Sequence, residues 1–205
     1  MYDILQTFSL GLVIGLTGAL APGPMLVATI NASISGDWKI GPKVVVGHMI
    51  AESVIFLLIV LGLATLALPY TTAIAVIGGI ALIVFGALTI AGSREASING
   101  PVTGTAGNPY VAGLVTSVAN PYFWIWWLTI GSAMVIAGLA GGIVLAAVFM
   151  VGHWCADIGW FTLVSAGISQ GRTILSDTSY RRIMGVCGVF LILFGAYYLS
   201  TLFVP

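Results

Sequence analysis

The sequence predicts an all-α integral membrane protein with six transmembrane helices arranged as a 3+3 inverted repeat, in which spans one and four are broken at proline. Its composition excludes a soluble domain, because the 205 residues are 60% hydrophobic and only 6% charged, against a typical charged share of roughly 25%. No charged residue occurs in Ile4–Gly36 or in Ser53–Ser93. These stretches predict the lipid bilayer as a partner. The formal net charge of zero gives no basis for binding a nucleic acid.

Six apolar segments are each long enough to cross the hydrocarbon core, which takes about 20 helical residues. The predicted spans are Phe8–Ile34, Val44–Leu68, Thr72–Ala91, Tyr110–Met134, Gly141–Ser169 and Ile183–Phe203. Residues 1–95 contain the first three spans as repeat 1, residues 96–109 form a cytoplasmic linker, and residues 110–205 contain the last three as repeat 2. Three spans are an odd number, so the second repeat inserts with the opposite orientation to the first.

Proline interrupts the first and fourth spans. Ala-Pro-Gly-Pro occupies Ala21–Pro24, and Ala-Asn-Pro occupies Ala119–Pro121. A proline inside a helix removes a backbone donor and clashes with the preceding turn, so both helices should break. Freed backbone groups at membrane depth are tolerated only beside protein or a water-filled cavity. We therefore expect the breaks to border a substrate or ion site, although proline is also common in membrane helices for no functional reason.

The residues assigned to this site from the breaks are Pro22, Gly23, Pro24, Asn120 and Pro121. Trp124, shortly after the second break, is a candidate for the cavity wall. The alternative for Trp124 is an ordinary position at the membrane boundary, where tryptophan is enriched.

The second and fifth spans each contain the pattern G-H-x-x-A-[D/E], at Gly47–Glu52 and Gly152–Asp157. In each copy the histidine precedes the acid by four residues, so both side chains lie on one face of the helix. Ionisable residues within spans are costly and mark substrate or ion pathways. The structural alternative is a carboxylate that only hydrogen-bonds its own histidine or the broken helix of its repeat.

The third and sixth spans share a G-x6-G pattern that ends in Phe-Gly-Ala, at Gly79–Ala87 and Gly188–Ala196. This similarity supports the internal repeat. All six basic residues fall between spans one and two, after span three, or between spans five and six: Lys39, Lys43, Arg94, Arg172, Arg181 and Arg182. Because cytoplasmic loops are enriched in Lys and Arg, both termini of this multi-pass plasma-membrane protein should lie outside.

These motifs resemble the lysine exporter (LysE) superfamily of small six-span transporters, and in particular its LysE-type amino-acid translocators, over nearly the whole chain. Pro22-Gly23-Pro24 matches the family's first-span Pro-Gly-Pro. Glu52, with its preceding Gly47, matches the acidic residue of the second span. Asn120-Pro121 matches the Asn-Pro of the fourth span, but Tyr122 stands where amino-acid exporters of the family often have a lysine.

The resemblance implies a secondary transporter that exports amino acids or related small metabolites. It implies no enzymatic activity and no cofactor. The sequence contains no G-x-x-x-x-G-K-[S/T] loop, so a gradient of H⁺ or Na⁺ is the expected energy source. The broken helices would hold the charged ends of the substrate. Glu52 or Asp157 would alternate between protonated and ionised forms. A homodimer is a further expectation, because 205 residues make a thin bundle.

The alternative function is export of a divalent metal cation. His48, Glu52, His153 and Asp157 would then converge as two nitrogen and two oxygen ligands for an ion such as Zn²⁺ or Mn²⁺. The spacing permits this arrangement without requiring the two halves to meet, and it leaves open whether the histidines bind or only orient the acids.

Overall fold

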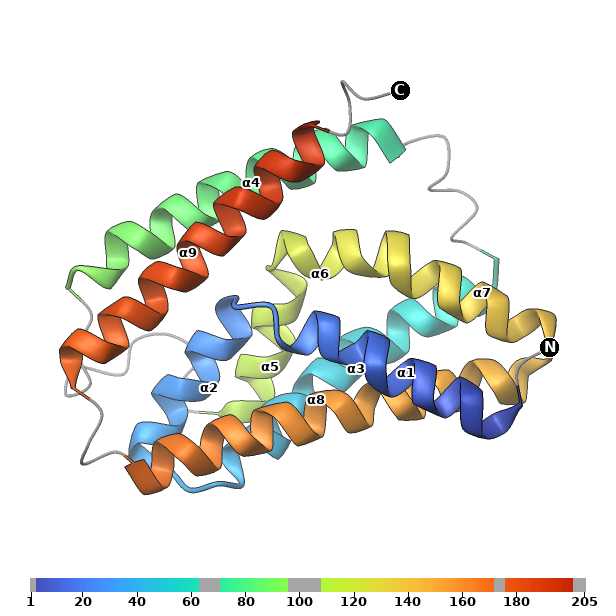
Figure 1. The fold of residues 1–205 in the computed structure, drawn as a ribbon, viewed down its shortest axis with the longest axis horizontal. Helices are drawn as coiled ribbons and strands as arrows, with labels where there is room; N and C mark the ends of the chain where they lie inside the picture. Colours follow the sequence, from blue (N-terminus) through green and yellow to red (C-terminus); the bar gives the residue numbers. More distant parts are fainter. Residues whose placement is uncertain (1–2, 63–70, 96–107, 172–175, 201–205) are drawn as a thin grey trace.

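The computed structural model describes residues 3–62, 71–95, 108–171 and 176–200. This part of the chain is almost entirely helical, apart from the breaks and turns between helices, and includes no strand, as predicted. The helices are α1 (Ile4–Ala19), α2 (Pro24–Ser35), α3 (Ile40–Val60), α4 (Thr71–Ser93), α5 (Pro109–Val118), α6 (Pro121–Trp126), the π-helical segment η3 (Trp127–Gly131), α7 (Ser132–Ala140), α8 (Ile143–Gly171) and α9 (Asp177–Ser200). Figure 1 shows their arrangement.

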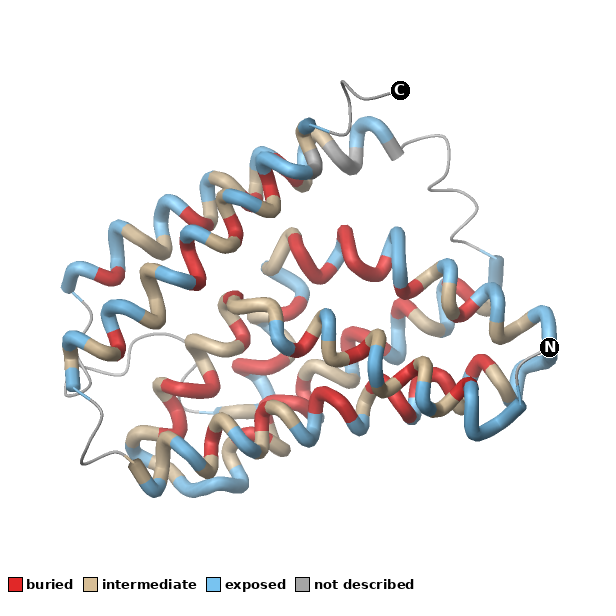
Figure 2. Tube along the Cα trace, in the orientation of Figure 1, coloured by how far each residue is buried: buried red, intermediate tan, exposed pale blue. Residues whose placement is uncertain are grey.

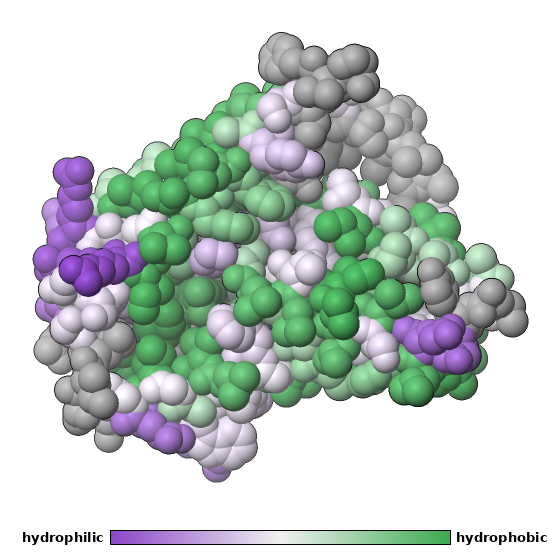
Figure 3. Space-filling view, in the orientation of Figure 1, coloured by the Kyte–Doolittle hydropathy of each residue, from purple (hydrophilic) through white to green (hydrophobic). Residues whose placement is uncertain are grey.

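Five helical segments of the described chain are long and apolar enough to cross a membrane: Ile40–Val60, Val76–Ser93, Pro121–Ala140, Ile143–Gly171 and Asp177–Tyr197. The bent pair α1 and α2 forms a sixth candidate when it is taken as one span. The distribution of hydropathy over the surface agrees with these spans. Apolar residues cover the sides of the helices, and strongly hydrophilic residues gather towards the ends of the molecule (Figure 3). The chain is therefore a multi-pass membrane protein.

Both predicted breaks are present. α1 ends at Ala19, α2 begins at Pro24, and the two axes differ by 80°. At the second break α5 ends at Val118 and α6 begins at Pro121. Pro24 and Pro121 each occupy the first position of the new helix, where the missing N–H group costs nothing. Proline therefore ends one helix and starts the next instead of kinking a continuous one.

The fourth span differs most from its predicted bounds of Tyr110–Met134. The segment before the break, α5, has only 10 residues. The helical segment after it, Pro121–Ala140, has 20 residues and is a candidate span by itself. The predicted ends at Leu68 and Phe203, and residues 96–107 of the predicted linker, lie outside the described residues.

The most extensive helix contacts are those of α4 with α9, α1 with α8, and α3 with α5. Glycine allows the contact between α3 and α5. A Cβ atom at Gly47 would collide with the carbonyl oxygen of Tyr110, and one at Gly113 with that of Val44. Small residues at helix contacts let two backbones approach in this way.

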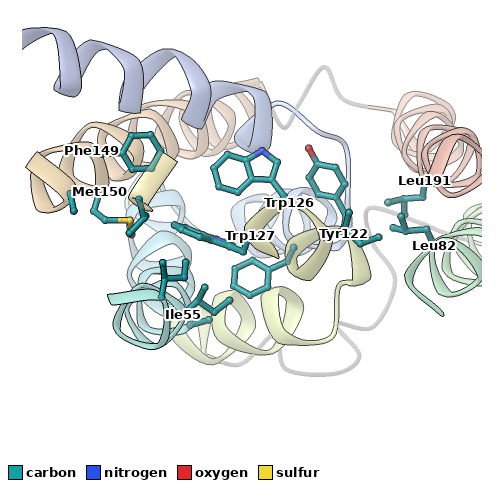
Figure 4. Packing of buried hydrophobic residues seen from close by; sticks show 14 residues of the cluster. Ile55, Leu82, Tyr122, Trp126, Trp127, Phe149, Met150 and Leu191 are labelled. Atoms are coloured by element: carbon teal, nitrogen blue, oxygen red, sulfur yellow. The ribbon is translucent and has the colours of Figure 1, made fainter. Parts of the chain in front are cut away.

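Buried residues concentrate where α3, α5, α6 and α8 meet (Figure 2). The core there is rich in large side chains, including Trp126, Trp127 and Phe149. Figure 4 shows Leu82 of α4 and Leu191 of α9 facing each other, with Tyr122 between this pair and Trp126. The α4–α9 pair is thus joined to the rest of the bundle through α6.

Candidate functional site

The two copies of the His-acid motif meet at the contact of α3 with α8. Glu52 Oε1 lies 2.9 Å from His48 Nε2 and 2.8 Å from His153 Nε2. Asp157 Oδ2 lies 3.3 Å from His153 Nε2 and 3.9 Å from His48 Nε2. One nitrogen or oxygen atom from each of the four residues lies within 4.8 Å of all the others. We call these four residues the central cluster.

The central cluster is enclosed by the protein. Glu52, His153 and Asp157 are at most 2% exposed, and the His48 side chain is 12% exposed. Buried charges persist in proteins when they are paired or bind metals. Glu52 is paired with a histidine from each half of the chain, which extends the predicted pairing within one motif to a contact between the halves.

His48 is held in place from the side opposite Glu52. Its Nδ1 lies 2.6 Å from Ser117 Oγ, and the Ser117 hydroxyl donates to the carbonyl oxygen of Gly113, also at 2.6 Å. A serine hydroxyl has one proton, so both contacts are satisfied when His48 Nδ1–H donates to Ser117 Oγ. The Nε2 atom of His48 is then left for the central cluster. Ser117 carries no distinguishing signal in the sequence.

The two helix breaks lie side by side. Tyr122 in α6 donates its hydroxyl proton to the carbonyl oxygen of Thr17 in α1 at 3.3 Å. The indole N–H of Trp126 donates to the Thr17 hydroxyl at 3.4 Å. A Cβ atom at Gly23 would lie 3.5 Å from Asn120 Nδ2. Asn120 also caps α6, because its side-chain oxygen accepts from the backbone N–H of Tyr122 at 3.1 Å.

A profile of LysE type translocators matches residues 16–201, a range that contains both breaks and both copies of the motif. The chain belongs to the LysE type translocator family. No curated protein and no solved structure matches it. Family membership confirms the resemblance seen in the sequence. It makes the protein a membrane exporter and supports amino acids or related compounds as its substrates.

In this LysE type translocator, a cavity of about 60 Å³ joins the breaks to the central cluster. A water molecule needs on the order of 10–15 Å³ of such space, so the cavity has room for a few. Its walls include Ala19, Ala21 and Gly23 of the first break, Ser117 and Asn120 of the second, the four residues of the central cluster, and the aromatic residues Tyr122, Phe123, Trp126 and Trp127.

Only some of the predicted site residues of the translocator line this cavity. Gly23 and Asn120 line it, whereas Pro22, Pro24 and Pro121 lie outside the lining and shape the breaks. Trp124 does not form the wall as predicted. It is 40% exposed, and its indole N–H donates to the carbonyl oxygen of Val118.

Two neighbouring tryptophans take the role predicted for Trp124. The indole N–H of Trp127 donates to Glu52 Oε1 at 3.3 Å. The ring of Trp126 packs on the His153 imidazole, with 4.9 Å between ring centroids. Adjacent residues point about 100° apart around a helix of 3.6 residues per turn, so a series of tryptophans does not by itself reveal which of them face inward.

Proposed function

We propose that the protein is a secondary exporter of amino acids or related small metabolites, driven by a gradient of H⁺ or Na⁺. The observation that carries this proposal is that both helix breaks and both acids border one cavity. In transporters built from inverted repeats, substrate and coupling ion bind where broken helices meet near the middle of the membrane. Glu52 and Asp157 supply the anionic oxygens there for the coupling cation and for the substrate's amino group.

The first turn of α2 is the proposed place for the substrate's carboxylate. α2 starts at Pro24 with no side-chain cap on its amides. Met25 and Leu26, which belong to this turn, line the cavity. The first amides of a helix lack partners within the helix and carry partial positive charge, so they suit an anion. Transport in this proposal requires the two breaks to move relative to each other, so that the cavity opens to each side of the membrane in turn.

Helix contacts support the division into repeats at residues 1–95 and 110–205. If α1 corresponds to α5 and α3 to α8, the α1–α8 contact is the counterpart of the α3–α5 contact. Both contacts are made by glycines that face carbonyl groups. Gly11 faces Phe149 and Gly152 faces Phe8, as Gly47 and Gly113 do between α3 and α5. Export would then occur by rocking of one repeat against the other.

The basic residues support the proposed topology, with both termini outside the plasma membrane. Lys39 and Lys43 lie at the start of α3, Arg94 follows α4, and Arg181 and Arg182 lie near the start of α9. These helix ends lie at one end of the molecule (at the left in Figure 1), and α1 begins at the other. The positive-inside rule places that basic end in the cytoplasm.

Flux measurements on the full chain in proteoliposomes test the substrate and the energy source together. Vesicles are loaded with one labelled amino acid at a time, and an H⁺ gradient, an Na⁺ gradient or no gradient is imposed. The proposal predicts accelerated flux of at least one amino-acid class under one of the two gradients. Flux that is equal in all three arms, or no flux of any amino acid, contradicts the proposal.

A further inference from the structure

We propose that the central cluster binds one divalent transition-metal ion, with His48, Glu52, His153 and Asp157 as its ligands. This inference goes beyond the proposed function. The geometry of the four side chains alone supports the bound ion, whichever organic substrate the protein exports. The ion would occupy the position that the proposed function gives to the coupling cation.

The distances within the central cluster suit a four-coordinate ion. Ligand atoms about 2.0–2.1 Å from a tetrahedral metal lie about 3.3 Å from one another. The four histidine–carboxylate separations are 2.8, 2.9, 3.3 and 3.9 Å, which fall on both sides of this value. All four ligand atoms lie within 4.8 Å of one another. Shifts of the side chains alone would therefore bring them around one ion.

His48 has the surroundings of a metal ligand. Histidines that bind metals usually donate their second ring N–H to a neighbouring acceptor, which fixes the ring and its tautomer. The chain from His48 Nδ1 through Ser117 Oγ to the Gly113 carbonyl provides this support. It leaves Nε2 of a neutral His48 as a lone pair that faces Glu52 Oε1 at 2.9 Å. Two electron-rich atoms at that distance repel each other unless a proton or a metal cation lies between them, and a divalent ion would fill this place beside the neutral imidazole.

Buried atoms of the central cluster also lack hydrogen-bond partners. Glu52 Oε2 and Asp157 Oδ2 make no hydrogen bond, and both residues are at least 98% buried. The nearest ring nitrogen to Asp157 Oδ2, His153 Nε2 at 3.3 Å, is already bonded to Glu52 Oε1. A buried polar atom without a partner costs about 1–3 kcal/mol, and more when it is charged. A bound cation would give Asp157 Oδ2 a partner and would balance the charge of both carboxylates.

The ligand set indicates the class of metal. Two imidazoles with two carboxylates suit Zn²⁺, Mn²⁺ and similar ions, whereas Mg²⁺ and Ca²⁺ prefer oxygen ligands alone. The cysteine sulfurs, which would favour softer ions, do not belong to the central cluster. Cys155 is exposed, and Cys187 lies in α9. The adjoining cavity, which the four residues also line, would admit the ion with some of its water.

Metal titration of the purified protein tests this site without any transport assay. The full chain is prepared in detergent with a tag that contains no histidine, stripped with a chelator, and titrated calorimetrically with Zn²⁺, Mn²⁺ or Mg²⁺. We expect one Zn²⁺ or Mn²⁺ per chain and no binding of Mg²⁺. X-ray absorption at the zinc edge should show imidazole nitrogen and oxygen ligands without sulfur.

Single substitutions locate the bound ion. His48 and His153 are the only histidines in the sequence, so His48→Ala and His153→Ala should each abolish stoichiometric binding. Ser117→Ala should weaken binding about 10–100-fold, the usual effect of losing a residue that supports a ligand. Asp37→Asn is the matched control, because Asp37 is an exposed acid outside the central cluster, and this variant should bind like the wild type.

The proposal is overturned if the wild-type protein binds no transition metal at one ion per chain. It is equally overturned if His48→Ala/His153→Ala retains wild-type affinity, since the ion would then lie elsewhere. The wild-type titration does not depend on whether a variant folds, and monodisperse elution identifies the variants that do. Metal binding without amino-acid flux would support this inference and contradict the proposed function, so the two can fail separately.

Discussion

At the scale of single residues, Glu52 links the side chains of the site through one carboxylate oxygen. Its Oε1 atom lies within reach of His48 on its own helix, His153 on α8 and the indole N–H of Trp127. The sequence predicted the first of these contacts, because a spacing of four residues fixes one helical face. It could not predict the other two, since they depend on how α3 packs against α8 and on which tryptophan faces inward.

Ser117→Ala should lower the free energy of unfolding by about 1–3 kcal/mol, because His48 Nδ1–H loses its acceptor in a buried site. Ser53→Ala is the matched control. Ser53 also bonds the carbonyl four residues before it, at 2.7 Å, but it is exposed and supports no histidine. The control should change stability by less than about 0.5 kcal/mol. Chemical denaturation in detergent measures both variants, and equal effects would contradict the role given to Ser117.

At the scale of helices, the sequence predicted where each span exists better than where it ends. Proline located both breaks, because its steric effect on a helix is local. The apolar run after Pro121 contains no polar stop, so the predicted end at Met134 was too early. The helix continues to Ala140 and ends where Gly142 adopts a φ of +110°, a conformation that favours glycine.

Gly113→Ala should destabilise the protein by about 1–3 kcal/mol or more, because its Cβ would push against the Val44 carbonyl in the α3–α5 contact. Gly159→Ala in α8 is the matched control. Nothing lies within 4 Å of a Cβ atom at Gly159, so alanine should be neutral there or stabilise the helix by up to about 1 kcal/mol. Thermal unfolding in one detergent gives the comparison. If Gly113→Ala were as stable as Gly159→Ala, the close contact would be wrong.

At the scale of the whole molecule, the packing of the helices brings together features that lie far apart in the chain. Glu52 and His153 are 101 positions apart, yet they share a hydrogen bond. Neither the apolar pattern nor the spacing of charges determines which helices become neighbours, so the sequence predicted two matched motifs but not one cluster. The homodimer also stays a prediction, because a single chain does not test it.

Membrane topology can be measured with reporters fused after Pro205. With both termini outside, alkaline phosphatase at this position should be active and green fluorescent protein should be dark. The physical reason is the one-sided distribution of Lys and Arg. A reporter pair inserted after Arg94 should give the reverse result, since Arg94 lies on the predicted cytoplasmic side. A bright fluorescent protein at the C-terminus would contradict the proposed orientation.

Export by variants that keep the size of each acid but remove its charge tests most directly whether the central cluster is the working site of the transporter. Glu52→Gln, Asp157→Asn and the control Asp37→Asn are reconstituted at equal amounts, and flux is followed under the gradient that drives the wild type. We expect Glu52→Gln and Asp157→Asn each to lose at least about tenfold in rate, which corresponds to about 1.4 kcal/mol, and Asp37→Asn to export normally. Wild-type rates in both cluster variants would contradict this expectation.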